Sequence, residues 1–166
     1  MKFLENDLEN IIYDSNKIEL AKRGLNIKGT VLRQLRLGNY GVADLVSFSK
    51  GEYDLTYGGH DVSIITVYEL KKDAVGYDTL GQALRYVQGI KRYLKLRGVM
   101  INYIVKIVLV GRKISDTYDF SIGMGGFDGL AEVYTYDYSL NGLIFKKESG
   151  YYYTNEYFNI KKTLNI

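Results

Sequence analysis

The stretch VSIITVYELK, residues 62–71, has the composition of a buried β-strand. Five of its ten residues are β-branched, and such residues fit the pleated surface of a sheet. Because side chains alternate between the two faces of a strand, Glu69 and Lys71 project together while Leu70 points the other way, toward a core. This stretch therefore predicts a strand whose end presents an acid and an amine side by side.

A second acid lies in the preceding apolar run, VADLVSF at residues 42–48, where Asp44 stands near the start of an expected strand. Carboxylate oxygens are the ligands that Mg²⁺ prefers, and an ammonium group beside them can orient an attacking water. The three groups indicate metal-assisted hydrolysis of a phosphodiester. Two plainer interpretations stay open: Asp44 caps a turn after Gly41, or Glu69 and Lys71 form an exposed pair worth roughly 0–1 kcal/mol.

The flanking sequence predicts an α/β fold. Apolar periodicity indicates helices, and alternation or β-branched runs indicate strands. A helix between two strands implies a right-handed parallel crossover, so we expect a mixed sheet. In chain order the expected elements are a helix at 3–23, strands at 30–37 and 42–48, a glycine-containing excursion at 50–61, a strand at 62–71, a helix at 79–96, a strand at 102–112, a glycine-rich loop at 115–129, and a hairpin of 131–138 and 143–147 around the turn at Asn141-Gly142.

Length and composition limit the kind of site. At 166 residues the chain fits one domain, 1–166, with a core of about 3–112 and a C-terminal extension of about 113–166. The absence of cysteine excludes disulfides, thiolate zinc sites and thiol nucleophiles. His60 is the single histidine, so no histidine cluster can bind a metal. A carboxylate site for Mg²⁺ or Mn²⁺ is the metal site that remains.

Charge and hydropathy bear on location and partners. The charged N-terminus lacks the apolar core of a signal peptide, and no segment approaches the ~20 apolar residues of a membrane span, so we expect a cytoplasmic protein with no membrane partner. Residues 71–113 hold ten Lys/Arg and two Asp/Glu, leaving twelve and seventeen elsewhere. This basic segment suits a polyanion, although a solvated helix face explains it equally well.

Four elements occur in one order: a glutamate in the first helix, Gly41-Val42-Ala43-Asp44, Glu69-Leu70-Lys71, and Gln82 followed four residues later by Tyr86. This order resembles the PD-(D/E)xK nuclease superfamily, most closely the catalytic domain of NucS-type endonucleases. The resemblance covers about residues 4–96 and extends more weakly to residue 111. It departs from the motif at Ala43, where the family pattern has proline. It implies a restriction-endonuclease-like mixed central sheet flanked by helices, here with a C-terminal β-hairpin extension.

The resemblance also implies roles for individual residues. Asp44 and Glu69 would bind Mg²⁺ or Mn²⁺, with the carbonyl of Leu70 as a third ligand. Lys71 would orient or help deprotonate the attacking water. An acid of the first helix, Glu9 in preference to Glu5, would complete the site. Gln82 and Tyr86 are one helical turn apart and would reach the same edge of the site.

The implied function is a metal-dependent DNA nuclease, an endonuclease of repair, recombination or restriction type. By analogy with other small members of the superfamily, a homodimer is expected. Residues expected to contact nucleic acid, each of which also fits ordinary solvated surface, are Arg33, Lys72, Arg85, Tyr86 and Arg92.

Two other functions compete with the nuclease. One is a catalytically inactive nucleic-acid-binding or assembly module of the same fold. The other is an aromatic-rich interaction or carbohydrate-binding protein that uses Tyr134, Tyr136, Tyr138 and the tyrosines at 151–153, although alternating tyrosines are as easily sheet packing.

Overall fold

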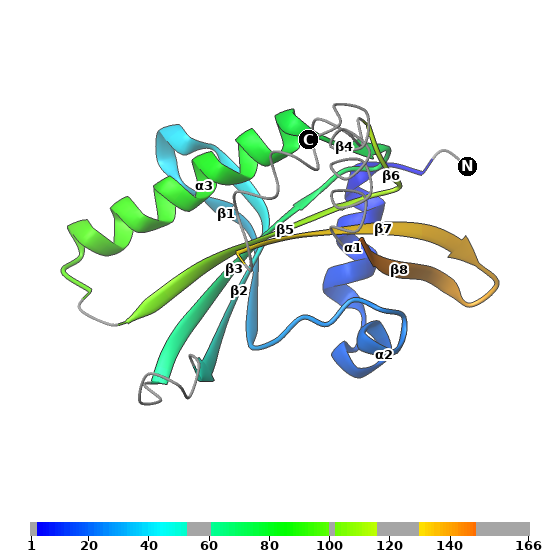
Figure 1. The fold of residues 1–166 in the computed structure, drawn as a ribbon, viewed down its shortest axis with the longest axis horizontal. Helices are drawn as coiled ribbons and strands as arrows, with labels where there is room; N and C mark the ends of the chain where they lie inside the picture. The colour runs from blue at the N-terminus through cyan, green and yellow to red at the C-terminus, as the bar shows by residue number, and fades with distance from the viewer. Residues whose placement is uncertain (1–2, 53–60, 100–101, 116–129, 149–166) are drawn as a thin grey trace, which may run out of the picture.

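Six strands form one mixed sheet in the order β1-β2-β3-β5-β7-β8. The structure is a computed structural model that describes residues 3–52, 61–99, 102–115 and 130–148 (Figure 1). The two neighbouring pairs around β5 are parallel, and the other three neighbouring pairs are antiparallel. The strands are β1 (Thr30–Arg36), β2 (Val42–Glu52), β3 (Asp61–Leu70), β5 (Tyr103–Gly111), β7 (Ala131–Ser139) and β8 (Gly142–Glu148). The predicted α/β class with a mixed central sheet is confirmed.

Helix α3 (Tyr77–Leu96) connects β3 to β5 and covers one face of the sheet (Figure 1). Parallel neighbours need such a crossover, because their connection must return along the full length of the sheet. The helix was expected at 79–96 and begins two residues earlier. Its buried side packs on side chains from the central strands, in a core that includes Leu80, Ala83, Val87, Ile90, Ile65, Val67, Ile107 and Leu109.

The opposite face is covered by α1 (Glu5–Asp14) and α2 (Lys17–Lys22) (Figure 1). The single helix predicted at 3–23 is wrong, because the chain breaks at Ser15 and Asn16. The side chain of Asn16 accepts a hydrogen bond of 2.8 Å from the backbone N–H of Ile18 and thereby caps α2. The second core, which packs under these helices, includes Leu8, Ile12, Leu20, Leu25, Leu45, Leu70, Val108 and Val110.

Some of the shorter elements and connections differ from the predicted ones. Between β1 and β2 the chain turns through a short 3-10 helix, η1 (Gly38–Tyr40), and β2 runs four residues beyond its predicted end. A small parallel pair, β4 (Ala74–Val75) with β6 (Lys113–Ile114), was not predicted. Of the excursion predicted at 50–61, residues 50–52 belong to β2 and residue 61 to β3, and residues 53–60, with His60, lie outside the described residues. Residues 116–129 of the loop predicted at 115–129 and the tyrosines at 151–153 also lie outside them.

The hairpin around Asn141-Gly142 is confirmed, with Gly142 at φ 109°. It extends the central sheet, because β7 pairs in parallel with β5. On β7, Tyr136 is 3 % exposed, its ring lies against Phe3 and Phe145, and its hydroxyl donates to the carbonyl of Lys72. This tyrosine therefore packs the sheet. None of the described helices is long and apolar enough to cross a membrane.

Candidate active site

The start of β2 and the end of β3 bring Asp44 and Glu69 together. The antiparallel register pairs Leu45 with Tyr68, so one residue further along Asp44 lies opposite Glu69. The backbone N–H of Leu70 donates a hydrogen bond of 2.9 Å to Oδ2 of Asp44. Two acids that are 25 positions apart in the sequence thus meet where β2 begins and β3 ends.

Lys71 completes this group. Its Nζ lies 2.8 Å from Oε1 of Glu69 and 3.5 Å from Oε1 of Glu5. Burial acts to lower the pKa of Lys71, but the hydrogen bond to Glu69 and the charges of Glu69, Glu5 and Asp44 outweigh burial and raise it. Lys71 is therefore a cation at neutral pH. This favours orienting a water or a phosphate oxygen over accepting a proton.

Both carboxyl groups are poorly solvated. Burial, with a smaller contribution from the charges of Glu5 and Glu9, raises the pKa of Asp44 from 3.8 to about 6 against the hydrogen bond from Leu70. Burial and then the charge of Asp44 raise the pKa of Glu69 from 4.5 to about 7, although Lys71 acts in the opposite direction. Mutual repulsion in a desolvated place is a recurrent property of catalytic acids.

Glu69 also has an unsatisfied atom. The residue is 1 % exposed, and its Oε2 is buried without a hydrogen-bond partner among the described residues. A buried carboxylate oxygen without a partner is costly, and a cation beside it removes that cost. The oxygens of Glu69 and Asp44 consequently fit a divalent ion, and the carbonyl of Leu70, the residue after Glu69, is a further oxygen ligand to consider.

The two glutamates of α1 occupy different surroundings. Glu9 is 3 % exposed, accepts hydrogen bonds from Nε of Arg33 and, at 2.5 Å, from Nε2 of Gln34, and ties α1 to β1. Glu5 is exposed and lies beside Lys71. The structure therefore places Glu5 against the lysine and Glu9 in a buried network close enough to raise the pKa of Asp44.

Gln34 was not among the predicted site residues. The register pairs Arg33 with Leu45 and Leu35 with Ala43, so Gln34 lies opposite Asp44. Its φ of 51° is the only positive value of a non-glycine residue in the described chain, a conformation that costs of order 1–3 kcal/mol. The one hint in the sequence is a polar residue that interrupts the alternation of this strand.

Gln82 and Tyr86 of α3 face the same region. Nε2 of Gln82 donates a hydrogen bond of 2.7 Å to the hydroxyl of Tyr86, which is 3 % exposed. Burial raises the pKa of Tyr86, and the charges of Glu69 and Asp44 add to the effect. These electrostatic interactions indicate that the tyrosine lies near both acids.

The expected nucleic-acid contacts are less concentrated. Arg33 donates to Glu9 and Asn10, Lys72 lies 3.4 Å from Oδ2 of Asp73, and Arg92 donates to the hydroxyl of Tyr40 at 3.4 Å. Arg85 is exposed on α3. Arg33, Lys72 and Arg92 therefore all have protein partners in the structure, and Lys72 directly follows Lys71 in the chain.

Within the described ranges, no group of three or more Asp, Glu or His side chains is arranged to hold a metal ion. Two carboxylates, a backbone carbonyl and one cation therefore make up the candidate site. Comparison of the chain with protein-family models, with curated proteins and with solved structures finds no match. The resemblance to the PD-(D/E)xK superfamily consequently stays a prediction that rests on the residues and on their geometry.

Proposed function

We propose that this chain is a metal-dependent nuclease of the PD-(D/E)xK type, which hydrolyses DNA phosphodiester bonds as an endonuclease of repair, recombination or restriction. The observation that carries the proposal is the meeting of Asp44 and Glu69, with the Nζ of Lys71 2.8 Å from Glu69 and one carboxylate oxygen of Glu69 left without a partner. A structural ion pair needs only one acid. A second, partly buried acid beside the buried Glu69 makes the arrangement costly unless a cation joins it.

Each residue of the site has a separate role in the proposed reaction. A bound Mg²⁺ or Mn²⁺ supplies Lewis acidity toward the scissile phosphate and lowers the pKa of a water. Asp44 and Glu69 hold the ion, and Lys71, which stays protonated, orients the attacking water and stabilises negative charge on the phosphate. Gln82 and Tyr86 position the nucleic-acid backbone beside the acids.

Basic side chains on and before α3 support a polyanionic substrate. Lys72 adjoins the site in the chain, and Arg85 is exposed on α3. Such side chains contact phosphates without reading sequence, so they favour nucleic acid as a class of substrate and leave its sequence open.

The test is a cleavage assay on the full chain with duplex, single-stranded and branched DNA in Mn²⁺ buffer. Wild type should cleave at least one form, and Lys71→Met should cleave it at least about 10²-fold more slowly. Lys146→Met, which changes a lysine on β8 that is 72 % exposed, is the matched control and should retain full activity. Equal rates for wild type and Lys71→Met would contradict the proposal.

One observation favours a second candidate, a nucleic-acid-binding module without catalysis. Asp44 already accepts the N–H of Leu70, and Lys71 already neutralises Glu69, so part of the site is satisfied internally. This candidate predicts salt-sensitive DNA binding without turnover, because phosphate contacts release counterions. The same assay separates the two candidates when binding is measured alongside cleavage.

A further inference from the structure

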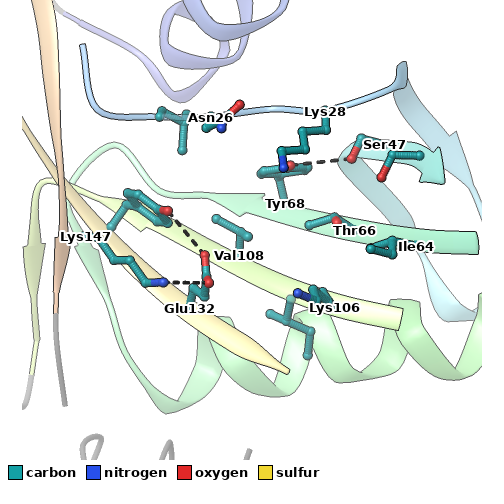
Figure 2. Close-up of a pocket in the computed structure, with 14 residues that line it drawn as sticks. Asn26, Lys28, Ser47, Ile64, Thr66, Tyr68, Lys106, Val108, Glu132 and Lys147 are labelled. Atoms are coloured by element: carbon teal, nitrogen blue, oxygen red, sulfur yellow. Dashed lines mark hydrogen bonds and ion pairs between the residues drawn. The ribbon is translucent and has the colours of Figure 1, made fainter. Parts of the chain in front are cut away.

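A cavity of about 270 Å³ lies between the segment after α2 and the face of the sheet that α1 and α2 cover (Figure 2). None of Asp44, Glu69, Lys71 and Gln82 lines it. Asn26 and Lys28 lie on one side of it, and side chains of β2, β3, β5 and β7 lie on the other (Figure 2). It is therefore distinct from the candidate active site.

The floor of this cavity is a polar row across three adjacent strands. Ser47 of β2 pairs in register with Thr66 of β3, and Thr66 pairs with Lys106 of β5. Register partners project from the same face of a sheet, so the three side chains lie beside one another. Ser47 is 2 % exposed and Thr66 is 8 % exposed, and the rest of this face carries the apolar second core.

These hydroxyls have hydrogen-bonding capacity to spare. Ser47 Oγ donates to the hydroxyl of Tyr68 over 3.5 Å, which is a long contact for two oxygens. Burial raises the pKa of Tyr68, so its hydroxyl remains a neutral donor. A side-chain hydrogen bond also joins Thr66 and Tyr68. Because each hydroxyl can donate one hydrogen bond and accept two, the three groups retain capacity for a ligand or a water.

The charge of the cavity is positive. Lys106 is partly buried and Lys28 is exposed, and neither forms an ion pair with any residue that the structure describes. The acid on the wall, Glu132, is neutralised by Nζ of Lys147 at 2.7 Å and also accepts the hydroxyl of Tyr134 at 3.2 Å. Two lysines are thus available to a ligand.

We propose that this cavity binds a tetrahedral oxyanion of the phosphate class, either inorganic phosphate or the phosphate of a mononucleotide. The acceptor oxygens of a phosphate match the hydroxyls of Ser47, Thr66 and Tyr68, and its charge matches Lys106 and Lys28. An apolar ligand of the same size would leave both lysines without a counter-charge. The inference does not depend on the nuclease proposal.

The test is isothermal titration of the full chain in metal-free buffer, first with inorganic phosphate and then with a deoxynucleoside 5′-monophosphate. Saturable binding of either anion is expected, and comparison of the two dissociation constants identifies the preferred source of the phosphate. Lys106→Gln and Thr66→Val should each raise the dissociation constant by about tenfold or more. Lys28→Gln changes an exposed side chain, so it tests the cavity even if the buried variants fold poorly.

Two controls locate the binding. Lys91→Gln alters an exposed lysine on α3, the helix on the other face of the sheet, and should leave the dissociation constant unchanged. Lys71→Met removes the cation of the candidate active site and should also leave it unchanged. Absence of binding by both anions, or binding that Lys71→Met abolishes while Lys106→Gln and Lys28→Gln retain it, would overturn the proposal.

Discussion

Replacement of Glu69 by glutamine removes a buried charge that the protein tolerates at a cost. The folded protein raises the pKa of this carboxyl from 4.5 to about 7, so above pH 7 the charged form is disfavoured in the folded state relative to the unfolded chain. At about 1.4 kcal/mol per pKa unit, the difference corresponds to roughly 3 kcal/mol. We therefore expect Glu69→Gln to raise the free energy of unfolding by about 1–3 kcal/mol at pH 8 while abolishing any cleavage.

The sign of the pH dependence follows from the same pKa. Between about pH 4.5 and 7 the folded wild type binds more protons at Glu69 than the unfolded chain does, so its stability falls as pH rises through this window. The variant lacks this titration. The difference in the free energy of unfolding between Glu69→Gln and wild type should consequently be largest at pH 7.5–8 and vanish near pH 4.5.

Urea unfolding followed by circular dichroism at several pH values, without divalent ions, measures both effects. Glu19→Gln is the control, because Glu19 is exposed and the hydrogen bond from Lys22 lowers its pKa. That variant should show no gain in stability at high pH. A Glu69→Gln protein that is less stable than wild type at pH 8 would show that the charge of Glu69 does not destabilise the fold.

Three further predictions test other parts of the structure. Mg²⁺ or Mn²⁺ should raise the melting temperature of wild type at pH 8 but leave that of Asp44→Asn nearly unchanged in scanning fluorimetry; equal shifts would argue against a metal at this site. Gly41→Ala should lower the free energy of unfolding by about 1–3 kcal/mol, because residue 41 has φ 105° and a Cβ there would lie 2.9 Å from Cε1 of Tyr86. Gly38→Ala, which has open space around its Cβ, should lower it less, and urea unfolding of the two variants measures the difference. Asn16→Ala should cost about 1 kcal/mol through loss of the α2 cap, and a thermal melt identical to wild type would contradict that role.

Local patterns predicted the central elements well. The β-branched run at 62–71, the amphipathic helix after it and the Asn141-Gly142 turn all form as expected, because each depends on residues close together in the chain. The break at Asn16 was missed although a capping residue marked it, since the apolar spacing of the first helix continued past it. The β4–β6 pair was missed because two-residue strands leave no periodic signal.

The site was predictable in part for the same reason. Glu69 and Lys71 share a face by strand periodicity, and their contact follows from that alone. The proximity of Asp44 to Glu69 depends on the register of β2 against β3. The sequence motif implied this proximity, and the pairing of Leu45 with Tyr68 sets the register that produces it. The positive φ of Gln34 depends on tertiary contacts that no local pattern encodes.

Whether Asp44 and Glu69 hold a metal ion together can be seen in the anomalous difference density of crystals of the full chain grown with Mn²⁺. We expect a peak in contact with carboxylate oxygens of both Asp44 and Glu69, and its loss in Asp44→Asn crystals grown in the same way. Manganese bound elsewhere, with no peak between these two acids and the Glu69–Lys71 ion pair intact, would contradict the claim.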